Sequence, residues 1–390
     1  MTRRSLGGVA LAGAASYLLA PSFVSASSLK RCSAHLLTAS WPLWEAYTSR
    51  FLDSGGRIVD HDDHDRTTSE GQAYALFFAL VANDRQRFAQ LLSWTEQNLA
   101  HGELASRLPA WLWGSQGETW GVLDENSASD ADLWLAYTLL EAGRLWKEPR
   151  YKTLGEALSR SIADNEVQDL PGLGPMLLPG PSGFVTADGF YQLNPSYLPL
   201  QVLLGLSNHL PQSPWSRIAQ LTPRVIRSSA PAGFVMDWIA YRPGDGFAID
   251  PVPRGEPLSS YDAIRVYLWA GMLAPGSAYR EQLLEASSGI VRYMQRNSVP
   301  PAQVQADGEI RNAEGNIGFS AALIPLLTAL HQNRSLEEQK VRLTLAKHPA
   351  TGLYGSEPRY YDQNLALFAV GWQDGRFCFD KQGLLQVSWR

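Results

Sequence analysis

The sequence predicts an all-α fold, an (α/α)6 toroid in which six inner helices alternate along the chain with six outer helices. An apolar helix preceded by a short polar or Pro/Gly turn recurs six times, and an amphipathic helix lies between successive apolar ones. No convincing run of strand-type alternation occurs. This regular order of two helix types favours a ring of helical hairpins.

The apolar helices are expected to form the inner ring, because a helix that is apolar on nearly all sides must be buried. Each of them follows a short turn that is rich in Ser, Thr, Asn or Arg. The predicted starts lie at residues 67–76, 127–130, 194–197, 259–262, 316–320 and 359–362.

The amphipathic helices carry a single apolar stripe, so they should cover the inner ring from outside. An open helical solenoid would show the same pattern and remains an alternative. The predicted outer helices are residues 41–52, 84–100, 150–167, 215–228, 278–297 and 335–347.

Residues 1–26 have the order of a secretory signal peptide: a basic start at Arg3 and Arg4, an apolar run, and small residues that end at Ala26. The Arg pair also resembles a twin-arginine export signal, and both export routes stay open. A retained membrane anchor is disfavoured, because Gly and Pro interrupt a run shorter than the ~20 apolar residues of a span. Residues 27–390 remain as one large domain, expected in the periplasm or outside the cell.

Composition points to a carbohydrate ligand. The net charge is -5, and the sequence contains no cluster of basic residues. Both features argue against nucleic acid or an anionic membrane as partner. Thirteen Trp and fifteen Tyr in a chain that is 18% charged provide flat apolar surfaces, and a sugar ring has such a face. Motifs of esterases, kinases and dehydrogenases are lacking. The His and Asp residues at 61–65 are interpreted as a solvated turn, so no metal or cofactor is expected.

The two cysteines, Cys32 and Cys378, are too few for a disulfide framework and lack the spacing of a metal site. An oxidising compartment would permit one bond between the two ends of the chain. Two separate buried thiols are the alternative.

Three acids lie at the starts of predicted inner helices: Glu70, Asp130 and Asp262, each three positions after a Ser or Thr. Taken singly, this spacing is typical of a capping box, in which the side chains satisfy free helix amides. In a toroid the inner helices run the same way, so the three carboxyl groups would meet at one end. Glycosidic cleavage needs two such groups.

A family resemblance runs from Trp41 to about Phe379. The Ala-Ser-Asp-Ala-Asp start of residues 128–146 resembles the signature of glycoside hydrolase family 8, and residues 68–72 and 260–265 look like the segments that carry its general acid and general base. Within the family, residues 111–114, 172–180 and 194–199 most resemble the endoglucanases encoded with bacterial cellulose synthase. Residues 182–192 match these relatives less well.

The resemblance implies a single catalytic (α/α)6 domain and an inverting endo-1,4-β-glucanase, or cellulase, that acts on β-1,4-glucan. Glu70 would be the acid, Asp262 the base that activates water, and Asp130 the residue that holds the sugar hydroxyls. Arg265 would orient Asp262, with an ordinary i,i+3 helix pair as the alternative, and Asp132 would be structural. A place in bacterial cellulose biosynthesis, in functional association with the cellulose synthase complex, is also implied.

Four aromatic residues are candidates for binding sugar rings at the open end: Trp113, Tyr197, Tyr261 and Tyr361. Trp111 is expected in the core. The alternatives that stay open are a polysaccharide lyase and a glycan-binding protein without catalysis. Within the family, xylan, chitosan and mixed-linkage glucan remain possible substrates.

Overall fold

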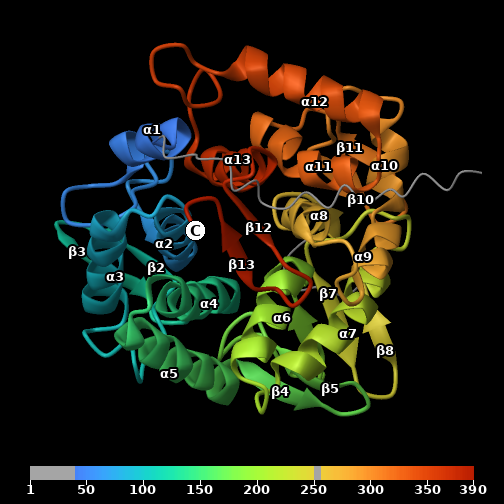
Figure 1. Ribbon diagram of the computed structural model, residues 1–390. Coiled ribbons are helices and arrows are strands. Elements are labelled where there is room, and N and C mark those ends of the chain that lie inside the picture. Colours follow the sequence, from blue (N-terminus) through green and yellow to red (C-terminus); the bar gives the residue numbers. More distant parts are fainter. Residues whose placement is uncertain (1–39, 250–255) are drawn as a thin grey trace, which may run out of the picture. The chain divides into compact units, whose positions relative to one another are not determined.

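The computed structural model describes residues 40–249 and 256–390, and Figure 1 shows their helices as two concentric sets. The predicted signal peptide and Cys32 lie outside the described residues, so the pairing of Cys32 with Cys378 stays a prediction. Cys378 itself, on the C-terminal hairpin, is not a free thiol. No helix in the described ranges is long and apolar enough to cross a membrane.

The inner ring contains six helices within the described residues. Each contacts the next along the chain, and the last contacts the first. The ring is therefore closed, which confirms the (α/α)6 toroid and excludes the open solenoid. The inner helices are α2 (Ser69–Val81), α4 (Ser129–Trp146), α6 (Leu200–His209), α8 (Ala263–Met272), α11 (Ile317–Ala329) and α13 (Tyr360–Gln373).

The outer positions are taken by six helical segments in the described ranges, one of which is broken. The expected single helix at residues 278–297 is wrong, because the amide of Gly289 bonds to the carbonyl of Gly233 at 2.8 Å instead of continuing the helix. The outer helices are α1 (Pro42–Phe51), α3 (Arg85–Leu99), α5 (Pro149–Glu166), α7 (Trp215–Ser228), the pair α9 (Arg280–Ala286) and α10 (Ser288–Met294), and α12 (Asn333–Ala346).

Short strands accompany the helices of this all-α fold. Short antiparallel sheets join the helices, and their strands of two to six residues are too short for alternation to stand out in the sequence. They are β1 (Thr67–Thr68) with β2 (Leu112–Gln116) and β3 (Thr119–Asp124); β4 (Val167–Leu170) with β5 (Gly174–Leu177); β6 (Tyr191–Leu193) with β7 (Ile239–Arg242) and β8 (Gly246–Ala248); β9 (Leu258–Ser259) with β10 (Gln303–Gln305) and β11 (Ile310–Asn312); and β12 (Phe377–Phe379) with β13 (Leu385–Val387).

These sheets fix the points at which inner helices begin. β1 ends one residue before α2, and β9 ends three residues before Asp262. The chain after β6 forms a 3-10 turn, Pro195–Tyr197, before α6 begins at Leu200, later than the sequence predicts. Proline at 195 and 199 explains the delay, because proline lacks an amide and disfavours helical backbone in the residue before it.

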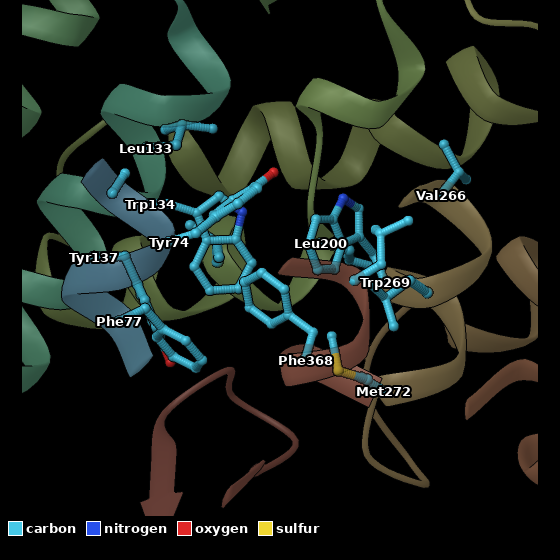
Figure 2. Packing of buried hydrophobic residues seen from close by; sticks show 14 of the residues in the cluster. Tyr74, Phe77, Leu133, Trp134, Tyr137, Leu200, Val266, Trp269, Met272 and Phe368 are labelled. Carbon is cyan, nitrogen blue, oxygen red and sulfur yellow. The ribbon is translucent and has the colours of Figure 1, made fainter. Parts of the chain in front are cut away.

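The centre of the ring is filled by aromatic side chains (Figure 2). The ring of Trp134 lies 5.2 Å from that of Trp269 and 5.1 Å from that of Phe368. Tyr74 meets Phe368 edge to face at 5.0 Å. Such contacts between aromatic rings add to the free energy of burying them. The toroid therefore has a packed core, and a substrate can enter only at an end of the ring.

Helices α8 and α11 approach each other so closely that only glycine fits at the contact. A Cβ atom on Gly271 would lie 2.1 Å from the backbone nitrogen of Leu326. We expect Gly271→Ala to lower the free energy of unfolding by about 1–3 kcal/mol, although alanine is the better helix former by ~1 kcal/mol. Thermal unfolding checks this. Gly121→Ala is the control, because no described atom comes within 4 Å of its Cβ; equal losses for both variants would contradict the close approach.

Candidate active site

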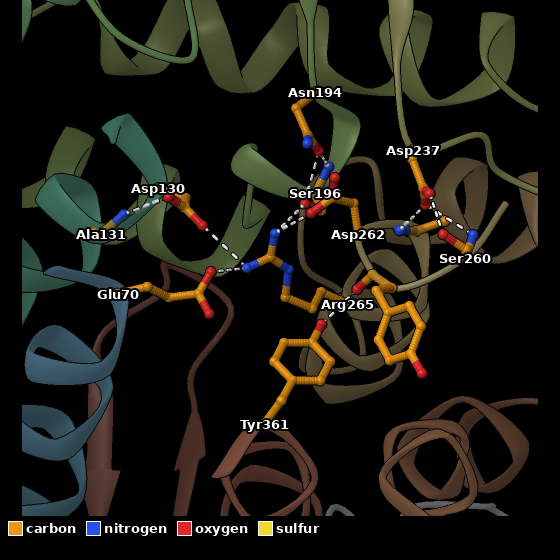
Figure 3. A network of polar contacts seen from close by, with 12 residues as sticks. Glu70, Asp130, Ala131, Asn194, Ser196, Asp237, Ser260, Asp262, Arg265 and Tyr361 are labelled. Atoms are coloured by element: carbon orange, nitrogen blue, oxygen red, sulfur yellow. Dashed lines mark hydrogen bonds and ion pairs between the residues drawn. The ribbon is translucent and has the colours of Figure 1, made fainter. Parts of the chain in front are cut away.

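The guanidinium of Arg265 lies at the centre of a cluster of acids at one end of the ring (Figure 3). Its Nη1 forms ion pairs with Glu70 of α2 and, at 3.1 Å, with Oδ2 of Asp130 of α4. Its Nη2 pairs with Oδ1 of Asp262 at 2.8 Å. The Arg265 side chain is only 3% exposed. The structure thus brings together the three carboxyl groups that the sequence singled out, from three separate helix starts.

Arg265 also contacts side chains that lie outside its own helix. Nη2 donates to the hydroxyl of Ser196 at 3.0 Å, and the guanidinium carbon lies 5.6 Å from the centre of the Tyr197 ring. Nη1 also reaches the hydroxyl of Tyr74 at 3.4 Å. The i,i+3 pair with Asp262 exists, but it is one of several contacts that hold this cation in place.

The predicted capping boxes do not form in the described residues. Thr68, not Thr67, caps α2 by accepting the amide of Gly71 at 3.2 Å. The hydroxyl of Thr67 donates to the carbonyl of Ile58, and Ser127 donates to Glu166. These hydroxyls therefore do not cap the helices, and the carboxyl groups of Glu70 and Asp130 pair with Arg265.

A residue that sequence reasoning missed caps α8. Asp237, in the loop between α7 and β7, accepts the amides of Ser260 and Ala263, each at 2.8 Å. It also accepts the hydroxyl of Ser260. No spacing in the sequence links Asp237 to a turn more than twenty residues away, so only the fold reveals this contact.

Burial changes the proton affinities of the acids. Burial and the charge of Glu70 raise the pKa of Asp130 well above its ordinary value, although Arg265 opposes them. Burial also raises the pKa of Asp262, against the charge of Arg265. The negative charge of Glu70 next to Asp130 thus favours the protonated form of Asp130.

Tyrosines predicted to bind sugar lie next to this cluster. The hydroxyl of Tyr361 donates to the carbonyl oxygen of Tyr261, and the two rings are 5.9 Å apart. Tyr261 is 46% exposed. Tyr197 lies against Arg265 on the other side. Aromatic side chains therefore lie next to the acid cluster.

The tryptophans before α4 are arranged differently from the expectation. Trp111 is not core, since it is 36% exposed. Trp113 packs its edge against Trp94 at 5.3 Å, stacks on Trp120 at 5.3 Å, and lies 4.9 Å from the guanidinium of Arg57. Trp120, which sequence reasoning passed over, is 51% exposed. Trp113 is thus engaged within a hairpin cluster, and a sugar-binding role for it is only a proposal.

The segment at residues 182–192 forms a wall near the site. Ser182 and Asn126 exchange two hydrogen bonds, at 3.0 and 3.2 Å. Phe184 stacks on Trp238 with nearly parallel rings, and Trp238 lies 6.4 Å from Tyr197. This loop therefore packs through Trp238 toward Tyr197, the tyrosine that lies against Arg265.

The His and Asp run at residues 61–65 forms an exposed turn. His61 pairs with Asp65 at 2.7 Å, and His64 and Asp65 adopt positive φ. In the part of the chain that the structure describes, no three His, Cys, Asp or Glu residues are arranged to hold a metal ion.

The family model of glycosyl hydrolases family 8 matches residues 22–375. The chain belongs to this family. It is a glycoside hydrolase, so the family assignment removes the lyase and binding-only alternatives. It is 44% identical over 390 residues, 100% of this chain and 97% of the relative, to an endoglucanase of Xanthomonas axonopodis pv. citri (strain 306). With an endoglucanase of Escherichia coli (strain K12) the identity is 41%, over 90% of this chain and 92% of the relative.

Among solved structures, the family 8 chain resembles an endo-1,4-D-glucanase from Vibrio fischeri ES114. The TM-score is 0.84 at 39% identity, and the match covers 90% of this chain and 99% of that chain. The likeness therefore extends over most of the chain.

The second acid of the signature, Asp132, is fully buried beside Glu166 at the end of α5. Ser127 donates to Oε1 of Glu166 at 2.5 Å. Burial raises the pKa of Glu166 to about 8, and burial and the charge of Glu166 raise that of Asp132 well above its ordinary value. The pair therefore holds a proton at neutral pH, which fits the structural role expected for Asp132.

This pair predicts a pH dependence of stability. The folded protein keeps a proton that an unfolded Glu releases above pH ~4.3. The free energy of unfolding should therefore fall as pH rises from about 5 to 8. Glu166→Gln removes this titration, so the melting temperature of the variant should fall less over the same range. Glu156→Gln, on the same helix but at a surface ion pair with Lys152, is the control and should behave as wild type. A Glu166→Gln variant with the full wild-type fall would show that the pair does not share a proton.

Proposed function

We propose that this family 8 hydrolase is an endo-1,4-β-D-glucanase that cleaves β-1,4-glucan with inversion of configuration. The observation that carries the proposal is the joint binding of Glu70 and Asp262 to one buried guanidinium. They bond to different nitrogens of Arg265, so one side chain links the two carboxyl groups. The endoglucanase names of the relatives support the choice of glucan.

Glu70 is the proposed acid that protonates the leaving oxygen. Its neighbour Asp130 pairs with the same guanidinium nitrogen, and burial and the charge of Glu70 raise the pKa of Asp130 well above its ordinary value. Glu70 therefore lies beside a group with a raised affinity for protons, as acid catalysis at this position requires. Binding of the sugar hydroxyls at the point of cleavage is the role proposed for Asp130 from the family resemblance.

Asp262 is the proposed base that takes a proton from the attacking water. Burial brings its pKa nearer to neutrality, which favours general base catalysis, while Arg265 keeps the charged form accessible. In an inverting glycosidase the two carboxyl groups leave room for a water at the far side of the sugar. The separate contacts of Glu70 and Asp262 on the guanidinium are consistent with such a gap.

The substrate is proposed to be a neutral glucan. Arg265, the cation at the centre of the site, is already compensated by three acids, so an acidic glycan would find no free positive charge there. The rings of Tyr197, Tyr261, Tyr361 and Trp113 are the proposed sugar-binding surfaces. Xylan, chitosan and lichenan remain to be compared with β-1,4-glucan.

The cellular location of the enzyme and its biological role are proposed from the sequence. The order of residues 1–26 supports export to the periplasm or the medium. A role in bacterial cellulose biosynthesis is supported by the resemblance to enzymes encoded with cellulose synthase, which lies in residues 111–114, 172–180 and 194–199. Functional association with the cellulose synthase complex follows from the same resemblance.

Glu70→Gln tests the acid assignment. The amide keeps the shape of the side chain but has no acidic proton, so we expect turnover of carboxymethylcellulose to fall by at least ~10²–10⁴-fold. Binding of a cello-oligosaccharide should persist. The assay measures reducing ends released from carboxymethylcellulose, lichenan, xylan and chitosan side by side.

Glu103→Gln, at an exposed position, is the control and should retain wild-type rates. Residual activity of Glu70→Gln near that of the control would overturn the role of Glu70. Faster release from xylan or chitosan than from the glucans would overturn the substrate assignment and leave the acid assignment intact.

A further inference from the structure

The N-terminus of α8 is capped from outside the helix. The residue at the N-cap position is Asp262, whose side chain makes no capping bond among the described residues. Asp normally uses its own carboxylate at this position to accept a helix amide. Here Asp262 pairs with Arg265 instead, and the carboxylate of Asp237 accepts the free amides.

Asp237 is held firmly enough to serve this purpose. Its own amide donates to the carbonyl of Leu258 at 2.7 Å, which ties it to β9. Two residues earlier, the amide of Val235 donates to the hydroxyl of Tyr267 on α8 at 2.8 Å. Two residues later β7 begins, paired with β6. The loop is therefore anchored both to α8 and to the sheet that leads into the Asn194 turn.

We propose that Asp237 is a positioning residue for the hydrolytic base: it holds the turn at residues 260–263 so that Asp262 faces the acid cluster, and it keeps a second negative charge beside Asp262. The inference rests on the proposed role of Asp262 as the base. It adds a residue that does not touch the reacting atoms and acts only through Asp262.

The bonding pattern distinguishes this role from an ordinary cap. If Asp237 were absent, the amide of Ala263 would lack its acceptor, and the nearest substitute would be the carboxylate of Asp262 itself. Asp262 would then turn from Arg265 toward its own helix. The external cap therefore leaves the carboxylate of Asp262 available for a water molecule.

The charge of Asp237 also acts on Asp262. The charge of Asp262, added to burial, raises the pKa of Asp237 to about 6, and the repulsion is mutual. Removing a negative charge near a carboxyl group favours ionisation of that group. The other charged or titratable groups that face Asp262 are Arg265 of α8, Glu70 of α2, and the phenols of Tyr197 and Tyr361.

Two variants separate the cap from the charge. In Asp237→Asn the amide oxygen can still accept from Ser260 and Ala263, but the negative charge is gone. We expect this variant to fold, and the acidic limb of its kcat/KM profile to move to lower pH by about 0.5–1 unit. In Asp237→Ala the acceptor is lost as well, so kcat should fall by about 10–100-fold with little change in KM, because the base is misplaced.

Asp245→Asn is the control. Asp245 lies on the neighbouring β7–β8 turn with its side chain 66% exposed, paired with Arg242. Its profile should match wild type. Melting curves of all three variants accompany the kinetics, and if Asp237→Ala fails to fold, the pH profile of Asp237→Asn decides alone.

An unmoved acidic limb in Asp237→Asn would overturn the inference, since it would leave Asp237 as a structural cap. Inactivity of Asp237→Asn equal to that of Asp262→Ala would also overturn it, because Asp237 would then act in the chemistry itself. Failure of the proposed function gives a different result: Asp262→Ala would retain activity whatever the behaviour of the Asp237 variants.

Discussion

The buried guanidinium of Arg265 must be compensated by the protein, because a charge removed from water is tolerated only where acids and hydrogen bonds replace the solvent. Glu70, Asp130 and Asp262 supply that compensation from the starts of α2, α4 and α8. One cation among three acids leaves an excess of negative charge. This excess, together with burial, raises the pKa of Asp130 well above its ordinary value, so the interaction that orders the site also changes the proton affinity of one of its acids.

The toroid makes this arrangement possible because the starts of its inner helices meet at one end. Two side chains join the acid cluster to the packed centre. Tyr74 reaches Arg265 with its hydroxyl and Phe368 with its ring, and Trp269 donates to the carbonyl of Ser196 at 3.1 Å. The position of the guanidinium is therefore set by the core, and the acids take their positions from it.

The sequence predicts the helix pattern that recurs along the chain and the segments that resemble the family. Six apolar helices that alternate with amphipathic ones favour a closed ring, and in such a ring the acids at the helix starts are expected to meet. The sequence does not predict which side chain caps each helix, because partners such as Asp237 and Ala263 are far apart along the chain. The short strands were missed because two to six residues carry little periodicity. Trp111 was placed in the core because exposure cannot be read from residue type.

In the proposed mechanism Glu70 and Asp262 act across a space that holds a water molecule, with no covalent sugar intermediate. Proton NMR of oligosaccharides released from a soluble β-1,4-glucan, recorded before mutarotation, tests it most directly. An inverting reaction produces the α-anomer first. Initial accumulation of the β-anomer, or a sugar trapped covalently on Asp262, would contradict the account and make Asp262 a nucleophile.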